Sequence, residues 1–366
     1  MWKTVKLGDV CDFQGGSQPP KKEFVYEEQK GYVRFIQIRD FKSDKNLTYI
    51  PVSNKNRLCR TDDIFIGRYG ASVGQILRGL EGAYNVALMK TIPNEEFISK
   101  GWLFAYLNSS LFQKPLKEVS SRSAQNGFSK DDISSFELPL PPLAEQERIV
   151  AKLDTVFAEI DEAISEVEAK ENEVQKLKAS LLSSSLNSDA VTWSTAKLGE
   201  ICILNYGKGL DKKDRSENAV IPVYGANGIK AYTDKLLHDK PSIIIGRKGS
   251  AGELNKVTKP FWALDVTYYV TTDESIVDID FLFYVLATLN LPSMARGIKP
   301  GINRNDVYNK SIKLPPLAEQ ERIVTKLDAA NSEFKNANEA IIKSKANYLA
   351  LKSAILAKEL QSSEAA

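Results

Sequence analysis

A ten-residue segment occurs twice in this chain of 366 residues. The sequence PPLAEQERIV spans residues 141–150 and returns unchanged at residues 315–324. Each copy follows a stretch of mixed composition and opens a stretch with regularly spaced apolar residues. Because self-similarity at a fixed distance indicates a repeated architecture, the chain is predicted to be a tandem of two units, each a globular lobe followed by a helix.

A looser repeat extends beyond this decamer. Three further pairs of segments are related in the same order: 2–11 with 193–202, 66–70 with 245–249, and 127–133 with 301–307. The two copies diverge most in residues 17–60 and 203–240. This pattern indicates one scaffold that carries two different surfaces.

Apolar residues recur every seven positions in the two segments that follow the decamer. The predicted seam consists of Leu153, Ile160, Val167, Val174 and Leu181 in the first helix, and Leu327, Phe334, Ile341, Tyr348 and Ile355 in the second. The offset positions carry Ile149, Val156, Ala163, Leu177, Ile323, Ala330, Ala337 and Leu351. A narrow stripe of this kind is typical of a coiled coil. Lys170 and Ser344 interrupt the stripe and predict a weaker seam in its middle.

The start of each helix carries residues suited to a helix N-terminus. Proline pairs occupy positions 141–142 and 315–316. Proline lacks a backbone N–H, and the first turn of a helix does not need one. Glu145 and Glu319 place negative charge at the positive end of the helix dipole. A first helix of about 40 residues would be about 60 Å long. If the ends of the second lobe lie close together, the second helix begins where the first stops and the two pair antiparallel.

The predicted fold class is α+β, with two α/β lobes separated by two long helices that form an antiparallel coiled coil, and an internal pseudo-twofold repeat. The predicted segments are the first lobe at 1–141, the first helix at 142–188, the second lobe at 189–315 and the second helix at 316–366. In this arrangement the helices are a ruler with a lobe at each end. The alternative is that each helix pairs with another chain.

Secondary structure within the lobes follows from local patterns. Strands are predicted at 33–38, 63–66 and 242–245, and helices at 102–116 and 279–291. The glycine-dense segments 66–74 and 245–252 follow strands and lack the Lys-Ser/Thr of a nucleotide-binding loop. They are therefore predicted to be tight turns that present the side chains between their glycines.

Few residues in the chain suggest catalysis. The single histidine, His238, has no counterpart in the other copy, and Cys11, Cys59 and Cys202 lack metal-ligand spacing. The cysteines are instead predicted to be small buried hydrophobic residues. The sequence has no Walker motif and no Asn/Asp-Pro-Pro-Tyr/Phe motif for amino methyl transfer. With neither an apolar signal segment after Met1 nor an apolar run of membrane length, the chain is predicted to be a cytoplasmic protein without membrane contact.

The charge of the chain is unevenly distributed. Lys and Arg outnumber Asp and Glu by four in residues 1–141 and by three in 189–315, whereas acidic residues exceed basic ones by five in 142–188. An acidic helix is repelled by phosphates, so a polyanion would meet the lobes. A solvated surface with a modest imbalance is the alternative explanation.

The order of lobe, LPPLAEQERIV helix, lobe and the same helix resembles the specificity (S) subunit of type I restriction-modification systems, over nearly the whole chain. The resemblance implies a non-catalytic subunit whose two target recognition domains each read one half of a bipartite, asymmetric sequence in double-stranded DNA. It also implies that the helices set the gap between half-sites and dock two methyltransferase (M) subunits, which restriction (R) subunits join in some systems. No cofactor is expected in this chain, because S-adenosylmethionine, ATP and Mg belong to the partner subunits.

DNA contact favours basic and amide side chains on positioned loops. The predicted DNA-contact residues lie on the two equivalent turns and before each long helix: Arg68, Tyr69, Arg122, Asn126 and Lys130 in the first lobe, and Arg247, Lys248, Arg296, Lys299 and Arg304 in the second. An ordinary surface or salt-bridge role is the alternative for each of them. Two other function classes also stay open, namely a stand-alone tandem DNA-binding regulator and a coiled-coil adaptor that binds no DNA.

Overall fold

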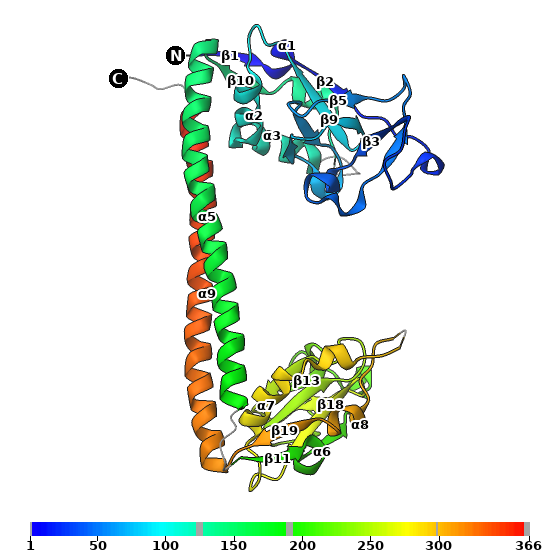
Figure 1. The fold of residues 1–366 in the computed structure, drawn as a ribbon, viewed down its shortest axis with the longest axis vertical. Coiled ribbons are helices and arrows are strands. Elements are labelled where there is room, and N and C mark those ends of the chain that lie inside the picture. The colour runs from blue at the N-terminus through cyan, green and yellow to red at the C-terminus, as the bar shows by residue number, and fades with distance from the viewer. Residues whose placement is uncertain (1, 122–126, 188–192, 298, 362–366) are drawn as a thin grey trace. The chain divides into compact units, whose positions relative to one another are not determined.

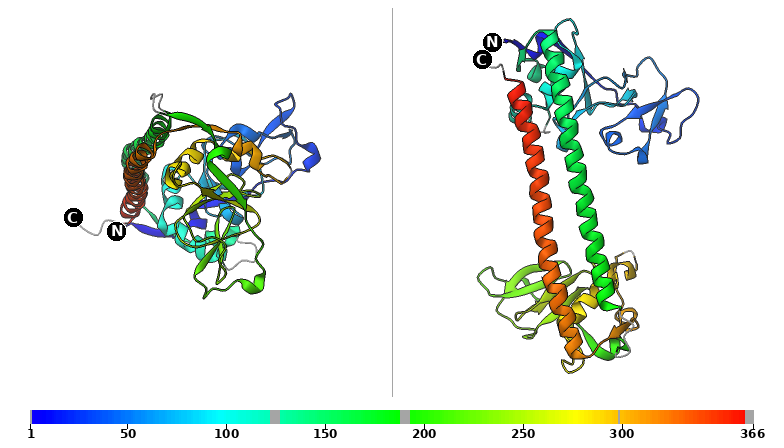
Figure 2. Two further views of the ribbon diagram at one scale, coloured as in Figure 1. Left: turned by 90° about the horizontal axis from the view of Figure 1, so that it is seen from below. Right: turned by 60° about the vertical axis from the view of Figure 1, so that its left-hand side comes forward.

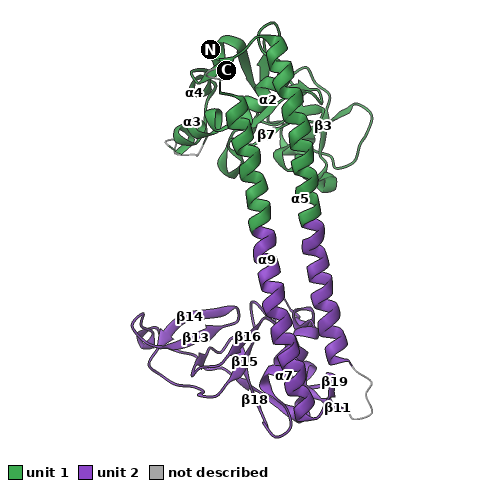
Figure 3. Cartoon of the chain, turned by 90° about the vertical axis from the view of Figure 1, so that its left-hand side faces the viewer, with its two compact units in different colours: residues 1–167, 343–366 green, residues 168–342 purple. Residues whose placement is uncertain are grey.

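The structure is a computed structural model that describes residues 2–121, 127–187, 193–297 and 299–361. The chain forms two compact units (Figure 3), and each is described by itself. Unit 1 comprises residues 1–167 and 343–366, and unit 2 comprises residues 168–342. Each unit therefore holds one lobe and parts of both long helices, α5 (Leu143–Leu186) and α9 (Leu317–Glu359). The predicted α+β class, with two mixed lobes and two long helices, is confirmed.

The lobe of unit 1 is built on two four-stranded sheets and a short closing pair of strands (Figure 1). The main sheet has the order β2-β9-β6-β7, the second sheet β4-β3-β8-β5, and β1 pairs antiparallel with β10. The strands are β1 (Lys3–Lys6), β2 (Cys11–Gly15), β3 (Tyr32–Ile36), β4 (Tyr49–Pro51), β5 (Leu58–Cys59), β6 (Phe65–Gly67), β7 (Ile76–Leu77), β8 (Gly82–Tyr84), β9 (Leu88–Pro93) and β10 (Glu137–Leu140). The helices of the lobe are α1 (Leu7–Val10), α2 (Lys100–Asn108), α3 (Ser110–Ser121) and α4 (Lys130–Ser134).

The lobe of unit 2 repeats this scaffold. Its main sheet β12-β18-β15-β16 matches the first main sheet, and β11 pairs antiparallel with β19. Its second sheet has three strands in the order β14-β13-β17. The strands are β11 (Ser194–Lys197), β12 (Cys202–Tyr206), β13 (Ile221–Gly225), β14 (Gly228–Thr233), β15 (Ser242–Gly246), β16 (Leu254–Val257), β17 (Trp262–Ala263), β18 (Thr267–Thr272) and β19 (Ser311–Leu314). The helices are α6 (Leu198–Ile201), α7 (Ile279–Thr288) and α8 (Arg304–Tyr308).

The second sheet is where the two lobes differ. Strands β3 and β4 come from the divergent segment 17–60, and β13 and β14 from the divergent segment 203–240. In contrast, the closing pair is alike in both copies, with Lys3 opposite Leu140 and Ser194 opposite Leu314. The pairing brings the two ends of each lobe together, as the predicted chain path requires.

In unit 1 the start of α5 and the end of α9 lie side by side in opposite directions (Figure 2). Nζ of Lys152 lies 2.7 Å from a carboxylate oxygen of Glu359, and Nζ of Lys352 lies 2.7 Å from Asp161. The later residue of α5, Asp161, pairs with the earlier residue of α9, Lys352, so the two helices run antiparallel here. Exposed ion pairs contribute little to stability, and the buried Leu153 and Leu356 share the lobe's core instead.

In unit 2 the end of α5 meets the start of α9. Leu181 and Leu182 of α5 pack against the same core as Leu327 of α9. The hydroxyl of Tyr284 on α7 donates to Asp328 on α9, and burial raises the pKa of Tyr284 to about 12. The hydroxyl therefore stays protonated near neutral pH and holds the lobe against α9. The antiparallel pairing is thus present in each unit.

A buried glutamine fixes each long helix to its lobe and explains one residue of the repeated decamer. Gln146 and Gln320 are fully buried. Oε1 of Gln146 accepts from the N–H of Ser99 at 2.8 Å, and its Nε2 donates to two backbone carbonyls at 2.8 and 2.9 Å. Gln320 makes the same three bonds, accepting from Asp278 and donating to the carbonyls of Ile276 and Pro315. Removal of the side chain takes the partner from three backbone groups, and the bond to the proline carbonyl is fully buried in both copies.

The predicted seam is correct at several positions and wrong at two of its offset positions. Leu153, Ile160 and Leu327 are buried. However, Leu177 is 60% exposed and Leu351 is 47% exposed, although the heptad pattern predicts both at the seam. The remaining seam residues are Val167, which is buried, and Val174, Leu181, Phe334, Ile341, Tyr348 and Ile355, which are half-buried. At the end of α9, Leu356 and the following residue Leu360 are buried, because there the chain faces the lobe as well as α5.

The structure corrects one further local prediction, on a helix, and supports another, on the cysteines. The predicted single helix 102–116 is two helices, α2 and α3, since the chain turns at Ser109, whose hydroxyl donates to the carbonyl of Tyr106. The three cysteines are buried, as predicted, and burial raises the pKa of Cys11 and Cys202 to about 12. Their thiols are therefore protonated near neutral pH and poorly nucleophilic.

Candidate nucleic-acid interface

Each main sheet ends in a tight turn that presents a basic side chain. A Cβ at Gly67 would lie 2.1 Å from the carbonyl oxygen of Ser72, and one at Gly246 would lie 2.1 Å from that of Ser250. Only glycine fits so close to the backbone, which explains the glycine that precedes the arginine in both turns. The next residues, Arg68 and Arg247, are half-buried at the same place in the two lobes.

In both lobes this turn pairs with the segment that precedes the last short helix. An antiparallel bridge joins Tyr69 to Gly127 in unit 1, and another joins Lys248 to Gly301 in unit 2. The bridges bring the turn next to the N-terminus of α4 or α8. The two groups of residues that the sequence predicted separately are therefore neighbours in unit 2, and in unit 1 the turn with Arg68 and Tyr69 lies next to the helix of Lys130.

Unit 2 gathers five basic side chains at this place. Arg296 also pairs with Gly301 through two backbone hydrogen bonds of 3.0 and 3.1 Å, and Gly301 in turn pairs with Lys248 of the turn. Among the described residues, none of these cations forms an ion pair with a carboxylate. We call them the unit 2 cationic cluster: Arg247, Lys248, Arg296, Lys299 and Arg304.

The corresponding place in unit 1 is less cationic. Lys130 of α4 forms an ion pair with Asp12 of β2, and this hydrogen bond holds the pKa of the carboxyl below its usual range. Arg68 donates from Nε to the carbonyl of Phe128 at 3.3 Å and lies 5.1 Å from the ring centre of Tyr69. The predicted residues Arg122 and Asn126 lie outside the described residues.

The aromatic part of the unit 2 site was missed by the sequence prediction. Tyr206, the last residue of β12, is 51% exposed, and the guanidinium groups of Arg247 and Arg304 both lie close to its ring. The distances from the guanidinium carbons to the ring centre are 5.4 and 5.2 Å. The sequence did contain a signal for Tyr206. Alignment of the two copies places Tyr206 opposite Gly15, so the two lobes differ at the end of a strand that both of them have.

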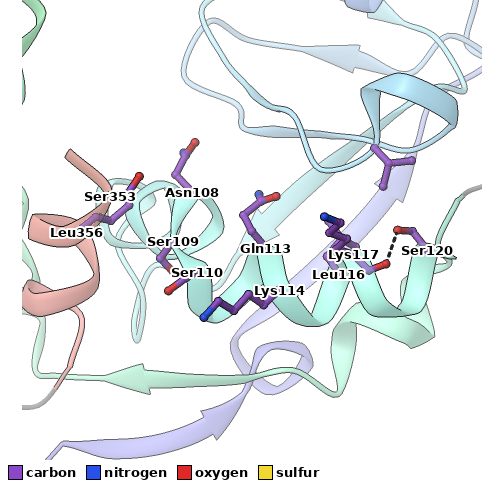
Figure 4. Close-up of a pocket in the computed structure, with 11 residues that line it drawn as sticks. Asn108, Ser109, Ser110, Gln113, Lys114, Leu116, Lys117, Ser120, Ser353 and Leu356 are labelled. Atoms are coloured by element: carbon purple, nitrogen blue, oxygen red, sulfur yellow. Dashed lines mark hydrogen bonds between the residues drawn. The ribbon is translucent and has the colours of Figure 1, made fainter. Parts of the chain in front are cut away.

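Some hollows among the described residues lie away from Arg68 and Arg247. One of about 600 Å³ lies in unit 1 beside α3 and the end of α9 (Figure 4). The amide of Gln113 donates to the carbonyls of Gly74 and Leu107 on its wall. None of the predicted DNA-contact residues lines it.

The described part of the chain offers little for other chemistry. It contains no group of three or more His, Cys, Asp or Glu side chains that could hold a metal ion. His238 packs against the rings of Phe261 and Tyr269, and burial lowers its pKa, so it is an uncharged packing residue near neutral pH. None of the helices in this part combines the length and apolarity needed to cross a bilayer.

The chain matches the model of the type I restriction modification DNA specificity domain twice, over residues 1–169 and 190–345. The chain belongs to this family. The two matched segments begin near the starts of the two lobes and run into the long helices, so the repeat in the sequence corresponds to a repeat of the family's domain. This match confirms the resemblance to a type I specificity subunit that the sequence indicated.

Individual relatives agree with this assignment. The chain is 23% identical to the type I restriction enzyme MjaVIII specificity subunit of Methanocaldococcus jannaschii, over 90% of this chain and 86% of that protein. A solved chain from work on complex assembly and conformational transition of the type I R-M system is 20% identical and covers 99% of this chain and 98% of its own, with a TM-score of 0.81. The HsdS subunit of Thermoanaerobacter tengcongensis gives 20% identity, coverage of 99% and 97%, and a TM-score of 0.53. At such identities the structural likeness concerns the fold.

Proposed function

We propose that this chain is the non-catalytic DNA specificity subunit of a type I restriction-modification complex. The observation that carries the proposal is the family's domain repeated on one scaffold, with a different second sheet in each lobe. A symmetric pair of lobes would read the same bases twice. Lobes that differ in their sheets and in their cationic turns suit a bipartite, asymmetric target in double-stranded DNA.

The unit 2 cationic cluster supports DNA as the ligand. Phosphate contacts by Lys and Arg provide most of the affinity for DNA and orient the protein on it, whereas contacts to base edges provide the specificity. A cluster without nearby carboxylate partners is well suited to phosphates. In unit 1, Arg68 and Tyr69 take the corresponding position, and Lys130 would exchange Asp12 for a phosphate.

The exposed side of the repeated decamer is the proposed docking surface for two methyltransferase subunits. Buried Gln146 and Gln320 account for one identical residue of each copy, but Glu147 and Arg148, like Glu321 and Arg322, are exposed. Arg148 and Arg322 each pair with a glutamate of their own helix, Glu145 or Glu319, but exposed ion pairs contribute little to stability and give two lobes that differ in sequence little reason to keep identical side chains. One partner bound once to each copy supplies such a reason.

Catalysis is proposed to reside in the partner chains. S-adenosylmethionine would be bound by the methyltransferase subunits, and ATP and Mg by restriction subunits where these are present. In this proposal the chain contributes DNA selection and assembly, and its helices set the gap between the two half-sites.

The decisive experiment is methylation mapping. The chain is co-expressed with its candidate methyltransferase, and modified adenines are mapped across the host DNA with and without it. The expected result is one split motif that appears only when the chain is present, and a purified complex with two methyltransferase copies per chain. Unchanged methylation, together with selective DNA binding by the isolated chain, would favour a stand-alone regulator. Absence of DNA binding in every combination would favour a coiled-coil adaptor.

Replacement of Arg247 and Lys248 by alanine is expected to weaken DNA binding by the assembled complex about tenfold or more at moderate salt, and to reduce the salt slope by roughly 1–2. The physical reason is the loss of up to two phosphate contacts. The measurement is fluorescence anisotropy on a duplex that contains the mapped motif, at several salt concentrations.

A matched control removes two positive charges from the other end of the same strand pair. Lys240 precedes β15, and Lys259 follows Val257, which pairs with Ser242 at the start of β15. The Lys240→Ala/Lys259→Ala variant is expected to bind DNA nearly as well as the unmodified complex. Equal losses in both variants would show that net charge, rather than this turn, determines the affinity.

A further inference from the structure

Four side chains in unit 2 alternate between arginine and tyrosine, in the order Arg247, Tyr206, Arg304 and Tyr308. The guanidinium carbon of Arg247 lies 5.4 Å from the ring centre of Tyr206, and that of Arg304 lies 5.2 Å from the same ring and 5.6 Å from the ring of Tyr308. We call these four residues the arginine–tyrosine ladder. They come from β12, the turn after β15, and α8, so only the folded lobe assembles them.

Backbone groups hold the outer members of the ladder in place. Arg247 donates to the carbonyl of Asp265 from two nitrogens, at 3.2 and 2.7 Å. The hydroxyl of Tyr308 accepts from the N–H of Leu204 at 2.8 Å, and Arg304 donates to the carbonyl of Leu204 at 3.5 Å. Carbonyl oxygens orient the guanidinium groups without cancelling their charge.

The centre of the ladder rests on the lobe's core. The ring of Tyr206 lies 5.1 Å from the ring of Tyr268, whose buried hydroxyl donates to the carbonyl of Ile302 at 3.2 Å. Burial raises the pKa of Tyr268 to about 12, so this hydroxyl stays protonated near neutral pH. Tyr206 is therefore a supported aromatic face, half exposed to solvent.

The ladder concentrates positive charge that no carboxylate neutralises. Within the described residues, neither Arg247 nor Arg304 forms an ion pair with Asp or Glu, and the buried Nε of Arg304 has no hydrogen-bond partner. A guanidinium is attracted to the face of an aromatic ring and keeps its full positive charge there. The guanidinium fork also matches the geometry of a phosphate. The ladder thus presents two oriented cations to an anion.

Unit 1 lacks this arrangement at the equivalent positions. The repeat register aligns Gly15 with Tyr206 and Ser134 with Tyr308, and it aligns Lys130 with Arg304. Lys130 is neutralised by Asp12, whereas Ile203 stands at that position in unit 2. The difference between the lobes concerns charge as well as shape.

Resting on the proposed function, we propose that Tyr206 is a positioning residue that holds Arg247 and Arg304 as a pair of phosphate contacts to the DNA half-site of unit 2. Phosphate contact is independent of sequence. The pair therefore anchors the second lobe on the duplex, while other side chains of that lobe read bases. Tyr206 acts through the arginines and does not itself contact a base.

The test compares Tyr206→Ala, Tyr206→Leu and Tyr206→Phe in the complex with the methyltransferase subunits, on a duplex with the mapped motif and on an unrelated duplex. Alanine and leucine remove the aromatic face, and leucine still fills the space against Tyr268. Both are expected to weaken binding roughly fivefold to tenfold on both duplexes, and to reduce the salt slope by about 1–2. Phenylalanine keeps the face and is expected to bind within about twofold of the unmodified complex.

A double-mutant comparison separates positioning from direct contact. In the Arg247→Met/Arg304→Met background, Tyr206→Leu is expected to cause no further loss of affinity. An equal loss in that background would overturn the proposal, and so would a loss confined to the motif duplex, which indicates base contact. Unchanged binding by Tyr206→Leu would also overturn it. Failure of the proposed function gives a different result, because the unmodified complex would then bind both duplexes equally.

Discussion

Replacement of Gln320 by leucine is expected to lower the free energy of unfolding of unit 2 by about 2 kcal/mol, because it removes the hydrogen-bond partner of three backbone groups, one of them in a fully buried bond. These groups are the N–H of Asp278 and the carbonyls of Ile276 and Pro315. Thermal unfolding followed by circular dichroism measures the overall loss. Hydrogen exchange at the Asp278 amide measures the lost bond directly, and faster exchange is expected there.

The control lies one residue further along the same helix. Glu321 is exposed, so Glu321→Leu adds the same side chain without removing a buried hydrogen bond. It is expected to change stability by less than about 0.5 kcal/mol. The corresponding change in unit 1, Gln146→Leu, should accelerate exchange at Ser99. Unchanged exchange at both amides would contradict the role assigned to the buried glutamines.

Truncation of a buried seam leucine is expected to be at least as costly. Leu153→Ala and Leu327→Ala each remove a side chain that is 3% exposed, and the loss of burial together with the remaining cavity costs about 2–5 kcal/mol. Chemical denaturation monitored by circular dichroism checks this. Because the chain has two units, the unfolding curve is fitted with one transition for each unit.

The chain provides its own matched controls for this experiment. Leu177 and Leu351 occupy seam positions in the heptad pattern but are 60% and 47% exposed. Leu177→Ala and Leu351→Ala are expected to change the stability of the isolated chain by less than about 0.5 kcal/mol. If all four variants were equally destabilised, the heptad pattern would describe the packing better than the structure does.

Periodicity predicted the helices well and their packing only in part. Leu153 and Leu327 were correctly predicted because near the lobes the stripe faces both the partner helix and the lobe's core. Leu351 and Leu177 were predicted wrongly, because a heptad count assumes that one partner determines the buried face over the whole length. Near the end of α9 the lobe of unit 1 determines it as well, and Leu356 and the following Leu360 are buried instead.

The candidate site shows a similar division. The repeat register alone showed that Arg68 and Arg247 occupy equivalent turns, and the structure places both after the same strand of the main sheet. Tyr206 was missed because it lies about 40 residues before Arg247 and about 100 before Arg304 in the chain. Sequence distance carries no information on contacts that β-sheet pairing creates, here between β12, β18 and β15.

The repeated decamer determined, without any structure, that the chain has two copies of one scaffold, where its long helices begin, and to which family it is similar. These features depend on local chemistry and on identity between segments, and both are visible in a sequence. Only the tertiary structure decided that Gln146 and Gln320 bond three backbone groups each, and that Tyr206 lies close to both Arg247 and Arg304. Such contacts join segments far apart in the chain, and their geometry depends on how the sheets and helices pack.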